Sequence, residues 1–432
     1  MTHSRTPVAP ASAFGGDPHV GRAAGPSVII IGGGIIGLAV AYKLRLSHPT
    51  SEVTVLEKEP RVGQHQSGHN SGVLHAGLYY APGSFKARLA VSGIRQMTAF
   101  CEAHRVPHEI CGKLVVAADA SEIPRLRELL RRGEANGLSG LRWLSAPEMR
   151  EVEPHVGGVA AVHAPEEGIA DYPKVCETLA SEIVRLGGRV VTGARVRALQ
   201  HRPHGWHADT TIGDVSGEVL VNCAGLQSDR VARMAGERPG IAIIPFRGEY
   251  YTLRPERRYL VRNLIYPVPD PSFPFLGVHF TRHISGAIEA GPNAVLAFAR
   301  EGYRKSTVRP YDLAHALAFP GLWRFVARHP RMTVDEIRRS FSRRRFADAL
   351  ARLVPDITPG DLAPGGAGVR AQAVHPTGEL ANDFVFLSGP HALHVLNAPS
   401  PGATASLAIG DEIVRSLASQ LGAPADTARL TS

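Results

Sequence analysis

The chain has 432 residues, of which 44% are hydrophobic and 20% are charged, and its formal net charge is +9. This length exceeds what one hydrophobic core usually supports, so we expect two domains. The composition is typical of a soluble globular protein, and no run of about 18 apolar residues predicts a membrane-spanning helix. The positive charge comes with no nucleic-acid-binding motif, so we expect no nucleic-acid partner.

The N-terminal segment 1–25 is rich in Pro, Ala and Gly and has no apolar periodicity. We therefore predict that it is a disordered extension. It also lacks the continuous apolar core of a secretory signal, which makes the cytoplasm the expected compartment.

The segment SVIIIGGGIIGLAVAYKL predicts a buried strand, a glycine turn and a helix. Gly32, Gly34 and Gly37 have G-x-G-x-x-G spacing, and a second strand, EVTVLEK, places Glu57 20 residues after Gly37. Gly32 allows a tight turn, Gly34 lets the backbone approach a pyrophosphate, and Gly37 lets helix and strand pack closely. The helix N-terminus adds N–H donors, and Glu57 can accept hydrogen bonds from a ribose. These features predict a dinucleotide site.

The next segment, HQSGHNSGVLHAGLYY (65–80), holds three histidines among small and amide residues. A nicotinamide-binding fold usually continues here with further strand–helix units, whereas a long polar loop suits an extended ligand such as FAD. Zinc binding by His65 and His69 is disfavoured, because glycines and serines interrupt any helix that would align them and no further ligand set is close. We therefore expect no metal.

The remaining segments complete a cofactor fold and a second domain. Segment 174–200 predicts a helix, a glycine turn and a strand that returns beneath the dinucleotide, and a later strand ends in small residues at 223–225. From 241 to 300, strands separated by Pro and Gly indicate an antiparallel substrate domain. Near the C-terminus, the strand DFVFLSGP and a helix beginning near Pro401 would place positive potential at a flavin ring.

Several of these segments resemble one family. The glycine turn, PFRGEYY, GVRAQAV and NAPSPGAT are similar to the D-amino-acid-oxidase-like FAD oxidoreductases. HQSGHNSGVLHAGLYYAPGSFKA, LIYPVPDPSFPFLGVHFTR and GPNAVLAFAREGYR narrow the resemblance to the L-2-hydroxyglutarate dehydrogenases and oxidases, over about 27–415. The resemblance implies an α/β fold with a Rossmann-like FAD-binding domain of the D-amino-acid-oxidase (GR2) type and a substrate domain on a mixed or antiparallel sheet. We assign 26–80, 165–235 and 365–425 to the first domain, and 81–164 and 236–364 to the second.

The resemblance also implies an activity. It implies oxidation of L-2-hydroxyglutarate to 2-oxoglutarate, with hydride transfer from C2 to flavin N5 and electrons passing to a quinone or to oxygen. An amine or amino-acid oxidase resembling sarcosine or glycine oxidase is the alternative. The basic segment 324–352 is either a solvated helical face or a contact with an anionic membrane surface, which would make the enzyme peripheral to the inner membrane.

The reaction needs a base for the hydroxyl proton, and a neutral histidine suits this role. His75 is the first candidate, because related flavoenzymes have a histidine beside the isoalloxazine at about this position. In some of them the histidine carries the flavin covalently, but we expect non-covalent FAD here. His279, in GVHFTRH, is the second candidate. His69 is then expected near the ribityl or pyrophosphate part of FAD, and His65 is expected to be structural.

A dicarboxylate substrate calls for two cationic sites, and arginine offers a planar fork to each carboxylate. Arg370 in AGVRAQ resembles the carboxylate-binding arginine of amino-acid oxidases. Arg247 in PFRGEYY is the second candidate, with Tyr251 and Thr281 as hydroxyl donors. The residues expected to contact FAD are Gly32, Gly34, Ile35, Ile36, Gly37, Glu57, Lys58, Gln66, His69, Asn70, Ser71, Val196, Ala224, Gly225, Gly389, Pro399, Ser400, Pro401, Ala403 and Thr404.

Overall fold

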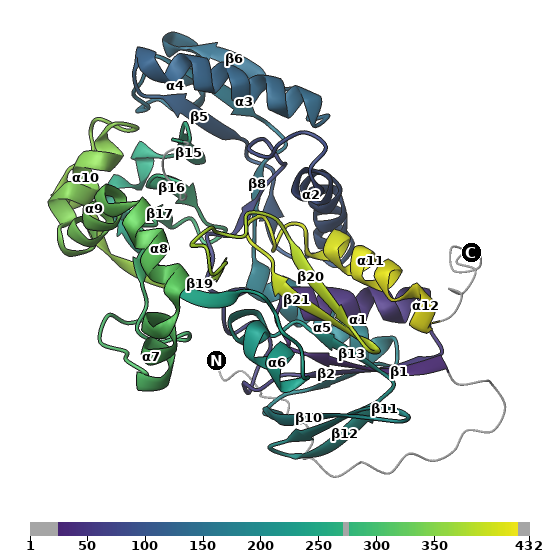
Figure 1. Ribbon diagram of the computed structural model, residues 1–432. Coiled ribbons are helices and arrows are strands. Elements are labelled where there is room, and N and C mark those ends of the chain that lie inside the picture. Colours follow the sequence, from purple (N-terminus) through teal and green to yellow (C-terminus); the bar gives the residue numbers. More distant parts are fainter. Residues whose placement is uncertain (1–24, 271–275, 422–432) are drawn as a thin grey trace, which may run out of the picture.

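The computed structural model describes residues 25–270 and 276–421, which form two large sheets with helices packed against them (Figure 1). The predicted N-terminal extension, apart from Gly25, lies outside the described residues. Among the described helices, none is both long and apolar enough to cross a membrane.

The first sheet has six strands in the order β20-β21-β13-β1-β2-β9. Its strands pair in parallel, except that β20 is antiparallel to β21. Val28 and the three residues after it are buried, as expected of a strand covered on both faces. The strands are β1 (Gly25–Ile31), β2 (Ser51–Leu56), β9 (Arg189–Val191), β13 (Val219–Asn222), β20 (Val385–Gly389) and β21 (Ala392–Asn397).

The helices α1 (Ile35–Ser47), α5 (Tyr172–Arg185) and α11 (Ser406–Ser416) cover this sheet, and α1 contacts both of the others. Small residues let them approach closely: a Cβ built on Gly410 of α11 would lie 3.0 Å from the carbonyl oxygen of Ala39 in α1. This tight contact holds the start of α1 at the carboxyl edge of the sheet, where dinucleotides bind in such folds.

The second sheet has nine strands in the order β18-β14-β17-β16-β15-β5-β7-β6, with β19 paired to β14. It is mixed, since β15 runs parallel to β5 while the other pairs are antiparallel. The strands are β5 (Lys113–Ala117), β6 (Arg142–Ser145), β7 (Ala160–Ala164), β14 (Ala242–Leu253), β15 (Leu264–Pro267), β16 (His279–Arg282), β17 (Ile288–Gly291), β18 (Val295–Leu296) and β19 (Leu362–Val374).

Two small sheets complete the fold. One is the antiparallel sheet β10-β11-β12, and the other is the antiparallel sheet β3-β8-β4, whose strand β3 ends immediately before His75. Their strands are β3 (Val73–Leu74), β4 (His108–Glu109), β8 (Gly168–Ala170), β10 (Val196–Arg202), β11 (Gly205–Thr210) and β12 (Gly213–Gly217). The other helices are α2 (Phe85–Ala103), α3 (Ile123–Ala135), α4 (Ala146–Val152), α6 (Ser228–Met234), α7 (Pro310–Ala318), α8 (Pro320–Arg328), α9 (Pro330–Phe341), α10 (Arg343–Ala351) and α12 (Ala418–Leu421), with short 3-10 turns at Ala120–Glu122, Gly225–Gln227, Pro255–Leu260 and Pro359–Asp361.

Three details differ from the sequence predictions. The strand β19 belongs to the second sheet, so the predicted boundary at 365 falls inside a strand. Helix α2, predicted within the substrate domain, packs against α11 of the first sheet's helical layer. The helix predicted near Pro401 begins at Ser406 instead. Pro399 and Pro401 each restrict the preceding residue to extended conformations, so the chain turns before the helix starts.

Candidate active site

A cavity of about 1240 Å³ lies where the two large sheets meet. Its walls come from the glycine turn, the loop at 63–80, strands β16 and β19, and the turn at 398–404. The volume exceeds that of most small-molecule pockets, which suits a large cofactor together with a small substrate.

The glycine turn forms one end of the cavity. Gly32 has φ +110°, and a Cβ there would lie 2.4 Å from the carbonyl oxygen of Cys223 in the neighbouring chain segment. A Cβ on Gly37 would lie 2.1 Å from the carbonyl oxygen of Gly32. Turn, helix α1 and the end of β13 therefore touch through backbone atoms, and Gly34 is left to line the cavity.

Glu57 follows β2 and is buried beside this turn. Its Oε2 accepts a hydrogen bond of 2.7 Å from the Gly33 N–H, and its Oε1 accepts one of 2.8 Å from the Glu59 N–H. No side chain caps helix α1 at Gly34, and the first helical N–H, that of Ile35, donates to Ser67 Oγ at 2.9 Å. A fixed carboxylate beside backbone donors at a helix start fits the ribose and pyrophosphate of a dinucleotide.

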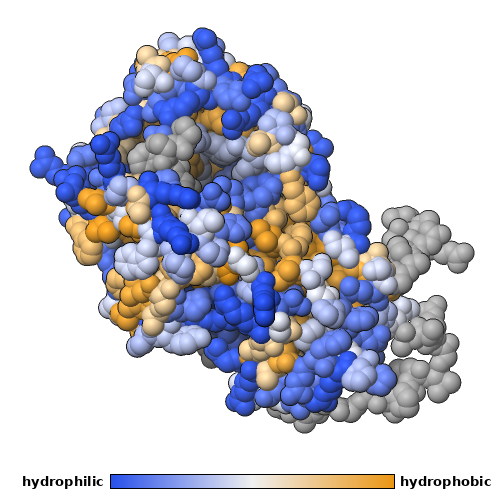
Figure 2. All heavy atoms as spheres, in the orientation of Figure 1, coloured by the Kyte–Doolittle hydropathy of each residue, from blue (hydrophilic) through white to orange (hydrophobic). Residues whose placement is uncertain are grey.

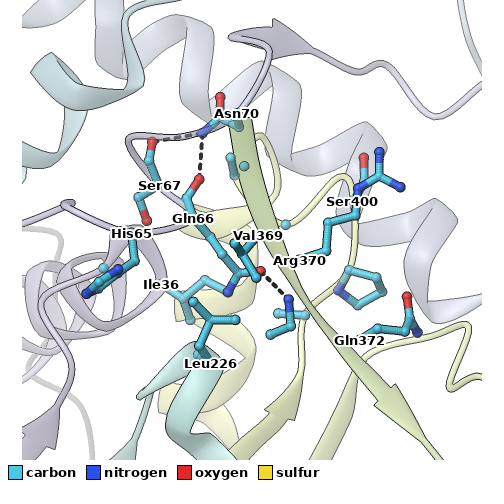
Figure 3. Close-up of a pocket in the computed structure, with 18 of the residues that line it drawn as sticks. Ile36, His65, Gln66, Ser67, Asn70, Leu226, Val369, Arg370, Gln372 and Ser400 are labelled. Atoms are coloured by element: carbon cyan, nitrogen blue, oxygen red, sulfur yellow. Dashed lines mark hydrogen bonds between the residues drawn. The ribbon is translucent and has the colours of Figure 1, made fainter. Parts of the chain in front are cut away.

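The loop at 63–80 is hydrogen-bonded to strand β19 of the second sheet. Gln66 Oε1 accepts a hydrogen bond of 2.9 Å from the Ala371 N–H in β19, and Asn70 Nδ2 donates to the carbonyl oxygens of Gln66 and Ser67 at 3.1 and 2.8 Å (Figure 3). These bonds hold the loop against β19 along the cavity wall.

The histidines of the loop have different surroundings. His65 Nδ1 lies 2.8 Å from the Tyr303 hydroxyl, and His69 stacks on the Tyr303 ring with 4.0 Å between ring centroids. Glu59, His65 and Glu301 are the described residues close enough to share a cation. Lys58 already supplies that positive charge, because its Nζ pairs with Glu59 and lies 2.9 Å from Glu301 Oε1 and from His65 Nε2.

His75 lies at the opposite end of the cavity, beside the turn at 398–404. Its backbone N–H donates to Thr404 Oγ1 at 3.2 Å, and Thr404 Oγ1 also lies 2.9 Å from the Tyr172 hydroxyl. Five predicted cofactor residues of this turn line the cavity: Pro399, Ser400, Pro401, Ala403 and Thr404.

Behind His75 lies a buried ion pair between Lys113 of β5 and Glu167, which precedes β8. His75 Nδ1 is 3.4 Å from Glu167 Oε2 and 3.4 Å from Lys113 Nζ. Although burial favours the neutral acid, Lys113 and His75 lower the pKa of Glu167 to about 2. Burial and the Lys113 charge lower the pKa of His75, while Glu167 opposes the change.

His279 of β16 also lines the cavity. Its Nδ1 lies 2.8 Å from the carbonyl oxygen of Gly277, and its ring stacks on Tyr266 with 3.9 Å between centroids. Burial lowers the pKa of His279 to about 3, and the nearby cations of Lys113 and Arg370 act in the same direction. The Nδ1 proton is therefore donated to the carbonyl, and the ring is neutral near pH 7.

Arg370 and Lys86 are two of the cationic residues that line the same cavity. Arg370 extends from β19 toward Ser400 (Figure 3) and forms a hydrogen bond with the side chain of Tyr250. Burial raises the pKa of Tyr250 to about 12, although the charge of Arg370 acts to lower it. Lys86 of α2 donates to the carbonyl oxygen of Asn382 at 3.2 Å, and burial lowers its pKa to about 8.

The structure places five predicted site residues outside the cavity lining, and one of them, Gly37, packs against the carbonyl oxygen of Gly32. Side chains alternate along a strand, and in β14 Gly248 and Tyr250 line the cavity, so Arg247 and Tyr251 point to the other face. Arg247 Nη2 pairs with Glu249 Oε1 at 2.9 Å. Two further residues lie away from the wall: Thr281 lies behind Tyr266, 3.5 Å from its hydroxyl, and Gly389 packs against Glu237.

The comparison with known families identifies the family of this chain. The family model described as FAD dependent oxidoreductase matches residues 27–416. The chain belongs to this FAD-dependent oxidoreductase family. The predicted α/β fold, the predicted family and the predicted cofactor, FAD, are thereby confirmed.

Curated relatives narrow the similarity. The chain is 50% identical to the L-2-hydroxyglutarate dehydrogenase of Indibacter alkaliphilus, over 89% of this chain and 97% of that protein. It is 42% identical to the protein of that name from Escherichia coli K12, over 93% and 95% of the two chains. The bovine mitochondrial L-2-hydroxyglutarate dehydrogenase is 42% identical, over 89% of this chain and 87% of that protein.

Solved structures share the fold at lower identity. The FAD-bound α-glycerophosphate oxidase of Mycoplasma pneumoniae has a TM-score of 0.74 at 23% identity, over 93% of this chain and 97% of that chain. The glycine oxidase of Geobacillus kaustophilus has a TM-score of 0.67 at 19% identity, with the same coverage. They show that this FAD-dependent oxidoreductase has the fold of both enzymes.

The residues present fit FAD, because the glycine turn leaves room for close backbone approach and Glu57 is fixed beside it. Of the twenty predicted cofactor residues, Gly37 and Gly389 do not line the cavity; Gly37 acts through backbone packing, as its predicted role requires. The sequence predictions missed Lys86, Lys113, Glu167 and Tyr250. Strand alternation beside PFRGEYY could have indicated Tyr250, whereas no motif marks the others.

Proposed function

We propose that this oxidoreductase uses FAD to oxidise L-2-hydroxyglutarate to 2-oxoglutarate. The observation that carries the proposal is that Arg370 and Lys86 line the cavity that also holds His75 and His279. Two cations and a base are what a dicarboxylate with a hydroxyl group requires. Relatives that are 42–50% identical over most of their length and are named for this activity support it further.

The described residues divide into a cofactor part and a substrate part. The Gly32–Gly37 turn, Glu57 and the turn at 398–404 would hold FAD, which supplies the acceptor for the C2 hydrogen and its electron pair. Arg370 would bind one carboxylate through its guanidinium fork, with the Tyr250 hydroxyl beside it. Lys86 takes the place that the sequence prediction gave to Arg247, because Arg247 is paired with Glu249 outside the cavity.

We assign the base to His75 rather than His279. A base must be stabilised after it takes the hydroxyl proton, and His75 has the Glu167 carboxylate 3.4 Å from its Nδ1. His279 has only a carbonyl oxygen at that position, and Arg370 opposes its protonation in addition to Lys113, which opposes that of both histidines. His279 would instead offer its Nε2 lone pair as a hydrogen-bond acceptor in the cavity.

Anaerobic reduction of the bound flavin tests the proposal. We expect L-2-hydroxyglutarate to bleach the flavin absorption band, and the D enantiomer and L-lactate, which lacks the second carboxylate, to do so far more slowly. Sarcosine and glycine belong in the same panel. Faster bleaching by either amine than by L-2-hydroxyglutarate would replace the proposal with an amine oxidase of the same fold.

We further propose that helices α7 to α10 contact an anionic membrane, where a quinone would accept the electrons. Apolar side chains are exposed on these helices, with 56% of Trp323, 48% of Ile337 and 79% of Phe341 accessible to solvent. Exposed arginines lie beside them, and Figure 2 shows apolar and hydrophilic residues side by side in this region. Apolar groups flanked by arginines are typical of surfaces that bind at a lipid interface.

Vesicle co-sedimentation tests this contact. We expect the FAD-bound protein to sediment with anionic vesicles at low salt and to be released as salt rises, because screened charges attract lipid headgroups less. The double substitution Arg344→Glu and Arg345→Glu should weaken sedimentation while flavin bleaching stays unchanged. The pair Arg131→Glu and Arg185→Glu, on exposed faces of α3 and α5, is the control. Equal binding by all three proteins would contradict the proposal.

A further inference from the structure

The buried carboxylate of Glu167 has few hydrogen-bond donors around it. Its side chain is 0% exposed, and apart from the Lys113 ion pair neither oxygen has a hydrogen-bond partner among the described residues. A buried carboxylate has about four lone-pair sites, and leaving them empty is costly. His75 Nδ1, 3.4 Å from Oε2, is able to supply a further donor.

Lys113, by contrast, has partners for its N–H groups. Its Nζ pairs with Glu167 and lies 4.5 Å from the ring centroid of Tyr266 and 5.0 Å from that of Tyr79. Aromatic faces attract an ammonium at these distances. Lys113 also lies 3.4 Å from His75 Nδ1, so it could donate there only if that nitrogen carried no proton.

The two arrangements put the His75 proton on different nitrogens. Donation by Lys113 would require a lone pair on Nδ1 and a proton on Nε2, and the ring could then take no proton from a substrate at Nε2. Donation by His75 to Glu167 puts the proton on Nδ1 and leaves Nε2 as the basic nitrogen. The shortage of donors at Glu167, set against the three partners of Lys113, favours the second arrangement.

We propose that Glu167 is a positioning residue that holds His75 as the Nδ1–H tautomer, and that Lys113 holds Glu167 in place as its counter-ion. The inference rests on the proposed role of His75 as the base. The three side chains come from the end of β3, the start of β5 and the turn before β8, and the small sheet β3-β8-β4 fixes two of these segments against each other. Neither Glu167 nor Lys113 needs to touch the substrate for this role.

The tautomer can be measured without turnover. A long-range ¹⁵N–¹H correlation spectrum of the FAD-bound protein, labelled at its histidine ring nitrogens, shows which nitrogen carries the proton. The His75 signals are assigned by their loss in His75→Asn. We expect a neutral ring protonated at Nδ1; a ring protonated at Nε2 would overturn the inference. Because no substrate is present, this result stands whether or not L-2-hydroxyglutarate proves to be the substrate.

Two substitutions at Glu167 separate positioning from packing. Glu167→Gln keeps an oxygen that can accept from Nδ1–H, so we expect the Nδ1–H tautomer and most of the flavin-reduction rate to persist. Glu167→Leu removes the acceptor and leaves Lys113 to donate to Nδ1. The Nε2–H tautomer should then appear, and kcat should fall about 100-fold, roughly the value of a general base, with KM little changed.

The failures of the two proposals are distinguishable. Equal rates and unchanged tautomers in Glu167→Gln and Glu167→Leu would overturn the positioning role even if L-2-hydroxyglutarate bleaches the flavin normally. Absence of bleaching in the wild-type protein with an Nδ1–H tautomer would overturn the proposed substrate alone. If Glu167→Leu does not fold, the wild-type tautomer still decides the inference.

Discussion

At the glycine-turn end the shape of the cavity wall is set by close backbone contacts beside the Glu57 carboxylate, whereas at the His75 end the wall is formed by histidines, tyrosines and a buried ion pair. Gly32, Gly34 and Gly37 belong to one turn, and the shape they create depends on side chains being absent. Around His75, by contrast, Lys113 in β5 and Glu167 in the turn before β8 come from segments far apart in the sequence. The first end recognises a cofactor by close backbone approach, and the second depends on how buried charges are arranged.

The difference implies different responses to substitution. At the backbone end an added methyl group should strongly weaken binding of the cofactor, because the backbone atoms of the turn leave no space for it. At the charged end a substitution should leave the cofactor bound and alter the reaction, because each side chain acts on the substrate or on its neighbour. The predictions below test this contrast.

The largest effect is expected for Gly37→Ala. Its Cβ would lie 2.1 Å from the carbonyl oxygen of Gly32, so helix α1 must move away from the turn. We expect FAD affinity to fall at least about 100-fold, close to 3 kcal/mol, a typical cost of overpacking. The ratio of flavin to protein absorbance measures this. Gly366→Ala is the control, since a Cβ there meets nothing within 4 Å; equal flavin content in both variants would contradict the prediction.

Next in size is the contrast between Arg370→Met and Arg247→Met. Arg370 lines the cavity and Arg247 does not, although both lie in paired strands of one sheet. Losing one partner of a desolvated charge pair costs about 2–5 kcal/mol, so kcat/KM for L-2-hydroxyglutarate should fall about 30-fold to 5000-fold in Arg370→Met with FAD retained. Arg247→Met should lower the melting temperature, through its lost Glu249 pair, and leave KM near that of the wild type. A large loss of kcat/KM in Arg247→Met, with little change in Arg370→Met, would instead support the sequence prediction that Arg247 binds the substrate.

His75→Ala should lower kcat about 100-fold or more while FAD remains bound, because a positioned general base contributes at least this much. His279→Ala should have a smaller effect, since His279 has a carbonyl oxygen rather than a carboxylate at its Nδ1 and Arg370 opposes its protonation. Stopped-flow flavin reduction measures both. A near wild-type rate in His75→Ala, with a large loss in His279→Ala, would transfer the role of base to His279.

The smallest effect concerns Lys86 and pH. Burial lowers its pKa to about 8, and only its protonated form attracts a carboxylate. The kcat/KM of the free enzyme should therefore be highest below pH 8 and fall about 10-fold as pH rises through that value. Lys86→Arg keeps its charge throughout this range and should abolish the alkaline fall. A pH profile that is identical in the two proteins would exclude Lys86 from substrate binding.

The same contrast explains what the sequence could predict. The glycine turn, β1, α1 and Glu57 follow from local spacing, because all lie within one strand–helix–strand unit. The strand predicted at β14 is confirmed, but the sequence prediction turned Arg247 and Tyr251 toward the cavity, whereas Tyr250 lines it. Alternation alone does not show which face of a strand borders the cavity. Glu167 was missed because its role depends on contact with Lys113 and His75 across three separate segments.

The hydrogen bond between Gln66 and the N–H of Ala371 has a consequence for ligand affinity. Ala371 follows Arg370 in β19, and Gln66 lies in the loop along the cofactor wall. A carboxylate that orders Arg370 therefore also orders the backbone to which that loop is fastened. Any free energy of coupling through this bond is reciprocal, so a dicarboxylate that increases the affinity for FAD must itself be bound more tightly, by the same factor, when FAD is present.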